Sequence, residues 1–268
     1  VGLLGIGTFT QINGITSAVN NFFDANNQWA VTLFGREYSW SVIISGILLT
    51  IFTALVLIGG LKRISSVAQV IVPFMAVTYF VVTLAILVYN FREIPNALAT
   101  IVQSAFGLRA VGGGAIGSMM IAMQMGVARG IFSNEAGLGS SVMVHSSSNV
   151  KEPVRQGMWG IFEVFADTMV VCTLTAFAVL SSGLIDLDTG AVLVDVSGSA
   201  LVGQAFASVF GSFGPAFIAI AILLFAFSTV LGWSHYGSKA CEYLFGTKST
   251  IVYNCLLYTS PSPRDGLL

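Results

Sequence analysis

The chain has 268 residues, of which 55% are hydrophobic and only 9% are charged. Since a soluble domain carries about 25% charged residues, most of these side chains face something other than water. The formal net charge of −1 gives no reason to expect a nucleic-acid partner. The cysteines, Cys172, Cys241 and Cys255, lack the spacing of a metal site or a disulfide framework, and we interpret them as small hydrophobic residues.

Six segments are apolar enough, or nearly so, to be membrane-spanning helices, which need about 20 mostly apolar residues. Their apolar residues form continuous blocks rather than one amphipathic face, which favours spans over a soluble core. In chain order they are residues 1–23, 40–59, 67–90, 112–132, 157–180 and 205–232. A seventh is expected to begin near Thr250. We expect the chain to begin inside a helix, because it starts without Met and is apolar at once.

The first segment contains two amides, Gln11 and Asn13, among its apolar residues. An unsatisfied amide is expensive in lipid, so both side chains must face the helix bundle or a cavity. For Asn13 we favour hydrogen bonding between helices. Gln11 fits either such a bond or contact with a ligand.

The basic residues between the segments predict the orientation of the chain. Seven of them fall in one alternating set of connections and three in the other, and the richer set is expected to be cytoplasmic. The richer set comprises Lys62, Arg63, Arg129, Lys151, Arg155, Lys239 and Lys248, and the poorer set Arg36, Arg92 and Arg109. The first segment then runs from inside to outside.

Residues 93–106 predict a short helix with one apolar face, and a glycine-rich cluster follows it. Four glycines occur among residues 112–117, and glycine is costly inside a helix. At membrane depth, unwound backbone persists only where protein buries it or where it lines a cavity. The pattern predicts a helix broken at a ligand site, as in secondary transporters. Close helix packing through small residues is the alternative.

The sequence RGIFSNEAGLGS, at residues 129–140, closely resembles the signature of the sodium:alanine symporter family. Further runs resemble the same family in the same order, so that the resemblance covers roughly residues 1–250. They are Ile71-Val72-Pro73-Phe74-Met75, Val154-Arg155-Gln156-Gly157, Asp167-Thr168, Val171-Cys172-Thr173-Leu174-Thr175, and Phe225-Ala226-Phe227-Ser228-Thr229 leading to Gly232-Trp233.

The resemblance implies an all-α membrane protein with part of a LeuT-type fold, which consists of two inverted repeats of five helices. On that map the chain holds the end of helix 3, helices 4 to 8 and the start of helix 9, without helices 1 and 2. We expect a partial transporter domain over residues 1–254. Residues 255–268 are Ser/Pro-rich where a span should continue, and we interpret them as a non-native tail.

The resemblance also implies a substrate site formed by Gln11, Gly112, Gly113, Gly114, Ser118 and Trp233. Backbone groups freed at a broken helix suit a zwitterion, because helix N-termini favour a carboxylate and carbonyl groups can meet an ammonium group. Family members often have Phe where this chain has Gly114, so the resemblance implies a larger pocket here.

Ser228 and Thr229 lie in a long apolar segment, and the resemblance implies that this pair binds sodium through its hydroxyl oxygens. The alternative is that each hydroxyl bonds to the backbone carbonyl one turn earlier, as is common in membrane helices.

Three charged residues are candidates for gating or coupling: Arg129, Glu135 and Asp167. Arg129 and Glu135 belong to residues 129–140, which we call the signature loop, and predict either an inner gate or a fixed ion pair. Acids within the membrane are functional candidates, and Asp167 lies one turn after a second acid, Glu163. Ser133 and Asn134 are natural caps for a short helix.

The sequence contains no HExxH, GxSxG, phosphate-loop or CxxC motif, so no enzymatic activity is predicted. We expect sodium-coupled symport of alanine or a similar small neutral amino acid across the plasma membrane, with Na⁺ as the coupling ion and no other cofactor. A membrane-embedded enzyme or a channel is the alternative, and proton coupling stays open.

Overall fold

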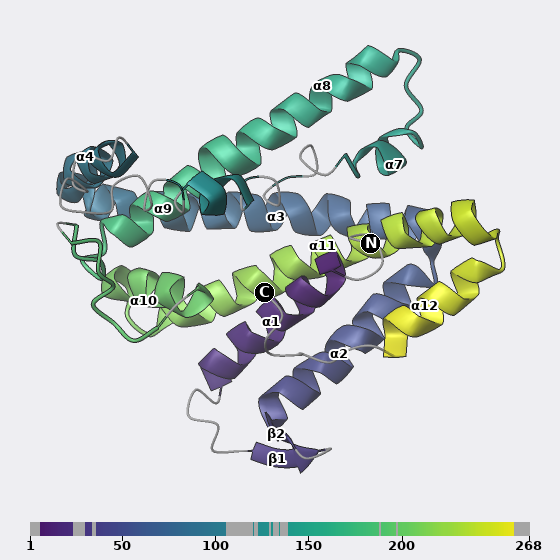
Figure 1. Ribbon diagram of the computed structural model, residues 1–268, viewed down its shortest axis with the longest axis horizontal. Coiled ribbons are helices and arrows are strands. Elements are labelled where there is room, and N and C mark those ends of the chain that lie inside the picture. Colours follow the sequence, from purple (N-terminus) through teal and green to yellow (C-terminus); the bar gives the residue numbers. More distant parts are fainter. Residues whose placement is uncertain are drawn as a thin grey trace. The chain divides into compact units, whose positions relative to one another are not determined.

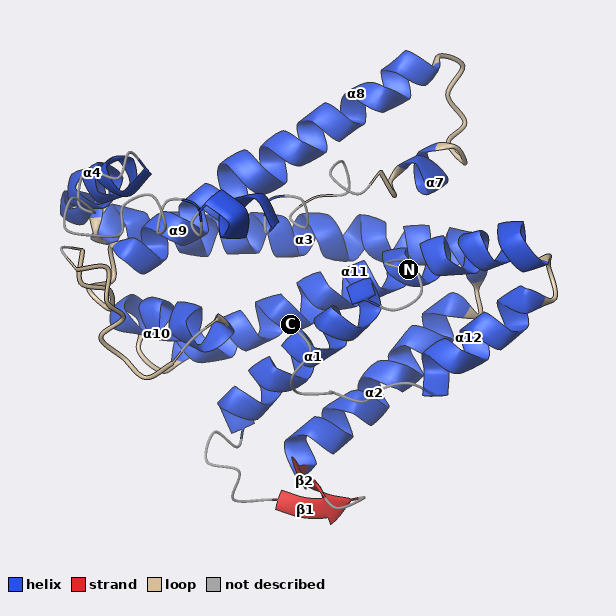
Figure 2. Ribbon diagram, viewed as in Figure 1, coloured by secondary structure: helices blue, strands red, loops and turns tan. Residues whose placement is uncertain are grey.

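The computed structural model describes residues 6–23, 30–33, 36–105, 120, 123–128, 130, 134, 139–187, 189–196 and 198–259. Helices dominate these residues, as Figure 2 shows. The chain divides into two compact units, one of Val1–Tyr79 with Val196–Leu268 and one of Phe80–Asp195. The expectation of an all-α protein therefore holds for the described residues apart from one short hairpin.

The first unit begins with a helix, a hairpin and two further helices. They are α1 (Ile6–Phe23), β1 (Ala30–Leu33), β2 (Arg36–Ser39), α2 (Trp40–Leu57) and the first part of α3 (Gly60–Tyr89). The strands are antiparallel, with Ala30 opposite Ser39. Ser39 caps α2, because its hydroxyl accepts a hydrogen bond from the Ser41 backbone N–H at 3.3 Å. The Ser41 hydroxyl donates to Asn20 at 2.6 Å and so joins α2 to α1.

The rest of the first unit is α10 (Ser199–Phe210), α11 (Phe213–Phe245) and α12 (Ser249–Thr259). Our prediction of one span over residues 205–232 is wrong, because two helices meet within it. Gly211 has a φ of +58°, a conformation that glycine adopts without strain, and it ends α10. A Cβ on Gly214 would overlap the backbone of Phe206 and Ala207. Only glycine therefore permits this close turn.

The core of the first unit lies where α1 and α11 pack side by side, as Figure 1 shows. Four helices contribute to its main buried cluster. The cluster contains Ile12, Ile15, Leu49, Ile64, Ala226, Phe227, Val230 and Leu231. Tyr79 packs at another place on α11, where its ring meets Phe225 edge-on at 5.7 Å. The α1–α11 pair is therefore held on several sides.

Within the described residues, the second unit contains the end of α3 and six shorter elements. They are η2 (Phe91–Glu93), α4 (Ile94–Ala105), α7 (Val142–His145), α8 (Pro153–Val164), the π-helical η3 (Phe165–Val171) and α9 (Cys172–Leu180). The short helix predicted over residues 93–106 is confirmed by α4. The predicted span 157–180 is also helical, but its middle widens into a π-helix.

Four helices of the described residues are long and apolar enough to cross a membrane: Trp40–Leu57, Gly60–Tyr89, Pro153–Leu180 and Phe213–Phe245. They agree with the predicted spans 40–59, 67–90 and 157–180, although α3 begins earlier than predicted. The fourth extends 13 residues beyond the end predicted at Gly232. The first segment is helical but less apolar than these four, and most of segment 112–132 lies outside the described residues.

Candidate functional site

The helices α1 and α11 run antiparallel. Their antiparallel packing determines which residues of the two helices lie at the same level, that is, at the same height along the helix axes. Ile12 of α1 belongs to the same buried cluster as Val230 of α11. Farther along α1, Ala18 lines a cavity together with Ile218, which lies earlier on α11. Residues around position 11 of α1 are therefore level with residues around positions 229–233 of α11.

Gln11 lies at this level and is half-buried. Its neighbour in sequence, Ile12, belongs to the main buried cluster, so α1 packs against α11 at the position of Gln11. The side chain of Asn13, for which we predicted bonding between helices, lies outside the described residues.

Trp233 lies on α11 at the same level and is 8% exposed. Its ring meets Tyr236 edge-on, with the ring centroids 6.0 Å apart. Such contacts favour one orientation of the indole, so Trp233 forms a fixed apolar surface. The structure thus brings two predicted substrate residues, Gln11 and Trp233, to one level of the α1–α11 pair.

Ser228 and Thr229 share one hydrogen-bond acceptor, the carbonyl oxygen of Phe225. The Ser228 hydroxyl donates to it at 2.8 Å and the Thr229 hydroxyl at 2.9 Å. This is the bonding to the preceding turn that we gave as the alternative to a sodium site. It leaves the sodium role open, since a hydroxyl that donates its proton keeps oxygen lone pairs for a cation.

Several predicted site residues lie outside the described residues. They are Gly112, Gly113, Gly114, Ser118, Arg129 and Glu135. The broken helix and the inner gate therefore stay predictions from the sequence.

Asp167 and Thr168 lie in the π-helical turn η3, and the Thr168 hydroxyl accepts a hydrogen bond from the Asn134 amide at 3.1 Å. Asp167 is half-buried, whereas Glu163 is exposed. π-helical turns inside α-helices occur frequently at functional sites. The bond joins the signature loop to this turn across 34 residues of sequence, and the sequence offered only the helix-capping character of Asn134 as a signal.

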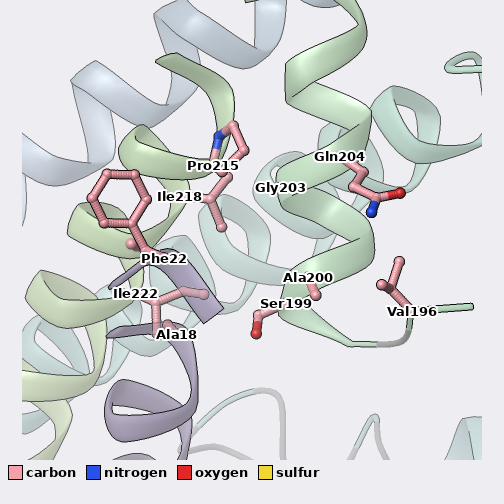
Figure 3. A pocket seen from close by; sticks show the side chains of 11 residues that line it. Ala18, Phe22, Val196, Ser199, Ala200, Gly203, Gln204, Pro215, Ile218 and Ile222 are labelled. Carbon is pink, nitrogen blue, oxygen red and sulfur yellow. The ribbon is translucent and has the colours of Figure 1, made fainter. Parts of the chain in front are cut away.

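A cavity of about 290 Å³ opens between α1, α10 and α11 (Figure 3). Its walls include Ala18 and Phe22 from α1, Ser199 and Gln204 from α10, and Ile222 from α11. Sequence reasoning missed this cavity, because it placed the region of α10 partly inside one continuous span.

A model of the sodium:alanine symporter family matches residues 1–260, which is almost the entire chain. The chain belongs to the sodium:alanine symporter family. The resemblance inferred from the signature loop is therefore confirmed, and the family is one of transporters rather than enzymes.

Three relatives give the extent of this likeness. The sodium/alanine symporter AgcS of Methanococcus maripaludis is 39% identical over 93% of this chain and 50% of its own length. An uncharacterized transporter of Haemophilus influenzae is 37% identical over 94% of this chain and 51% of its own. The amino-acid carrier protein AlsT of Bacillus subtilis is 35% identical over 89% and 46%. The chain spans about half the length of the curated relatives it matches.

Membership of this symporter family and the four apolar helices together identify a multi-pass integral protein of the plasma membrane. Within the described residues, the predicted substrate and sodium residues belong to the first unit, while Asp167 and the Asn134–Thr168 bond belong to the second.

Proposed function

We propose that the protein, at the length its gene encodes, is a sodium-coupled symporter of alanine or a similar small neutral amino acid. The family match over residues 1–260 carries this proposal. The printed names of AgcS, a sodium/alanine symporter, and AlsT, an amino-acid carrier, agree with it. The polar groups gathered at one level of α1 and α11 supply the chemistry such a function requires.

Gln11 and Trp233 are the proposed substrate contacts. A glutamine amide can donate to a carboxylate and accept from an ammonium group, which are the two charged groups of a zwitterion. The buried Trp233 ring limits the room beside it, and this favours a short side chain such as that of alanine. Gly112, Gly113, Gly114 and Ser118 complete the proposed set on the evidence of the sequence alone.

Ser228 and Thr229 are the proposed sodium ligands. Na⁺ is a hard cation that prefers oxygen, and two hydroxyls bonded to one carbonyl offer neighbouring oxygens with lone pairs free for coordination. Sodium and substrate would then bind at adjacent positions on α11, because Thr229 and Trp233 are about one helical turn apart.

Coupling follows if both ligands stabilise the same closed conformation. Each ligand then raises the affinity of the other, and Na⁺ moving down its gradient drives uptake of the amino acid. Asp167, Arg129 and Glu135 are the proposed gating or coupling residues. The hydrogen bond between Asn134 and Thr168 gives the signature loop a definite partner in this process.

The proposed architecture is the LeuT-type fold, with this chain covering the end of helix 3 to the start of helix 9. In this proposal residues 1–254 belong to the transporter domain and residues 255–268 are a non-native tail. The α1–α11 pair then corresponds to helices 3 and 8.

Uptake by the full-length gene product in proteoliposomes tests the function. Uptake of radiolabelled alanine is compared under inwardly directed gradients of Na⁺, K⁺ and H⁺ at equal ionic strength. We expect accumulation above equilibrium only with the Na⁺ gradient. Equal uptake under all three gradients would remove the sodium claim, and no uptake of any small amino acid would remove the substrate claim.

A further inference from the structure

The cavity between α1, α10 and α11 lies on the same helix faces as the proposed substrate and sodium residues. On α1, Ala18 lines the cavity and Gln11 precedes it by seven residues, which is close to two helical turns. On α11, Ile222 lines the cavity and Thr229 follows it by seven residues. Both proposed ligand residues therefore share a face with the cavity wall.

The direction of the two intervals also agrees. Because α1 and α11 are antiparallel, Gln11 is displaced from Ala18 in the same direction in space as Thr229 is displaced from Ile222. Each interval covers about 10 Å along the helix axis. The cavity and Gln11 thus lie at two ends of the contact between α1 and α11.

Small residues make room for the cavity. Ala18, Gly203 and Ala219 contribute little side-chain volume to its walls. A Cβ on Gly203 would be in van der Waals contact with Pro215 at 3.6 Å, so α10 and α11 approach closely beside the empty space. The volume of about 290 Å³ lies at the lower limit of ligand pockets, which hold about 300–1,000 Å³, and suits a small molecule.

The lining is mostly apolar but includes two side chains able to form hydrogen bonds. Ser199 contributes a hydroxyl and Gln204 an amide, both from α10 (Figure 3). An amide and a hydroxyl can each donate to a carboxylate and accept from an ammonium group. Ile218 and Ile222 provide an apolar wall for a short aliphatic side chain.

We propose that this cavity is a second binding site for the small neutral amino acid, which occupies it before or after the site at Gln11. The inference rests on the proposed function and deepens it. Its occupant is the transported substrate, because the cavity lies on the same faces of α1 and α11 as the residues proposed to bind that substrate, about 10 Å along the helices from them. Ser199 and Gln204 are its polar contacts, and Ala200 is a lining residue through which it can be probed.

Protection of a single cysteine from a thiol reagent tests the site. In the full-length gene product with its native cysteines replaced by serine, Ala200→Cys is labelled with a small water-soluble reagent in the presence and absence of saturating alanine. We expect alanine to slow labelling about tenfold. The same protection is expected in the double variant with Gln11→Leu, because the second site does not need Gln11. Ala191→Cys, in an exposed loop of the other unit, is the matched control and reacts equally with or without alanine.

Three results would overturn the inference: equal labelling with and without alanine, no labelling at all, or protection that disappears with Gln11→Leu. If Ala200→Cys does not fold, Ala219→Cys probes the opposite wall. Equilibrium binding adds an independent measure, since the wild type should bind two alanines and the cavity-filling variant Ala200→Phe one. A protein that transports alanine but shows one site and no protection refutes only the second site. A protein that neither binds nor transports any small neutral amino acid refutes the proposed function itself.

Discussion

The two units differ in how far protein surrounds their longest apolar helices. In the first unit, 39% of the most apolar stretch of α11 is buried within the protein, whereas the share for Pro153–Leu180 in the second unit is 6%. A buried helix must fit its neighbours closely, while an apolar helix that faces lipid need only be apolar. The candidate substrate and sodium residues are therefore positioned by packing. Asp167 and Thr168 depend on a local π-helical turn and on polar bonds.

The comparison predicts that substitutions in the first unit cost more than those in the second, and Gln11→Leu should have the largest effect. The variant removes an amide proposed to meet both charged groups of the substrate. Hydrogen bonds to charged groups contribute about 1.5–3 kcal/mol, so alanine affinity at the Gln11 site should fall about 10- to 150-fold. Equilibrium binding of radiolabelled alanine to the purified full-length protein measures this loss.

Gln11→Asn serves as the matched variant, since it keeps the amide on a shorter side chain. Its alanine affinity should lie between those of the wild type and Gln11→Leu. Unchanged affinity in Gln11→Leu would show that the amide serves only helix packing.

Gly214→Ala tests whether the first unit depends on close packing rather than on apolar character alone. The added Cβ would overlap the backbone of Phe206 and Ala207, so α10 and α11 must separate. Overpacking costs about 1–3 kcal/mol, and at about 2–4 °C per kcal/mol for a large chain the melting temperature should fall by about 2–12 °C. Thermal unfolding of the detergent-solubilised protein measures the change.

Gly46→Ala is the control, because a Cβ there would find no atom within 4 Å. It should leave the melting temperature unchanged or slightly raised, since Ala favours helix over Gly. Equal melting temperatures for Gly214→Ala and Gly46→Ala would show that the corner between α10 and α11 adapts freely.

The same contrast explains which features the sequence could predict. The spans 40–59, 67–90 and 157–180 were predictable, because a membrane demands about 20 apolar residues wherever a helix crosses it. The corner at Gly211 and Gly214 was not, because glycine is common inside apolar segments and its φ depends on packing between helices.

For the candidate site residues, the sequence identified the kinds of side chain and their order along the chain, but not the groups to which they bond. The shared acceptor of Ser228 and Thr229 follows from local helix geometry and appeared among the alternatives. The hydrogen bond from Asn134 to Thr168 joins residues 34 positions apart, and no sequence pattern around either residue predicts the other as its partner. The cavity required the relative placement of three helices, which periodicity along one segment does not contain.

Thr229→Val examines the sodium role within the first unit. Valine keeps the shape of threonine but removes the oxygen proposed to bind Na⁺. Loss of an interaction with a charged group, about 1.5 kcal/mol, should raise the Na⁺ concentration for half-maximal uptake about tenfold. Thr50→Val is matched to it, because Thr50 also donates to a carbonyl one turn earlier, that of Gly46, at 2.8 Å. Equal Na⁺ dependence in both variants would assign the Thr229 hydroxyl to helix bonding alone.

Thr168→Val should have the smallest effect, because the second unit relies on individual polar bonds rather than on dense packing. It removes the acceptor of the Asn134 amide, and a hydrogen bond contributes about 1 kcal/mol, or about fivefold in an equilibrium between conformations. We expect the maximal rate of uptake to change by about that factor, with alanine affinity unchanged and with rescue by Thr168→Ser.

A double-mutant cycle with Asn134→Ala decides whether this bond acts as a unit. If it does, the double variant should resemble either single variant, with a coupling energy of about 0.5–1.5 kcal/mol. Asn96→Ala, which breaks a local bond to Glu93 at 3.3 Å in the same unit, should leave uptake unchanged. Strictly additive effects of the two substitutions would mean that Asn134 and Thr168 act separately. A loss of alanine affinity in Thr168→Val as large as that in Gln11→Leu would refute the contrast between the units, since it would make the exposed helix as decisive for binding as the packed one.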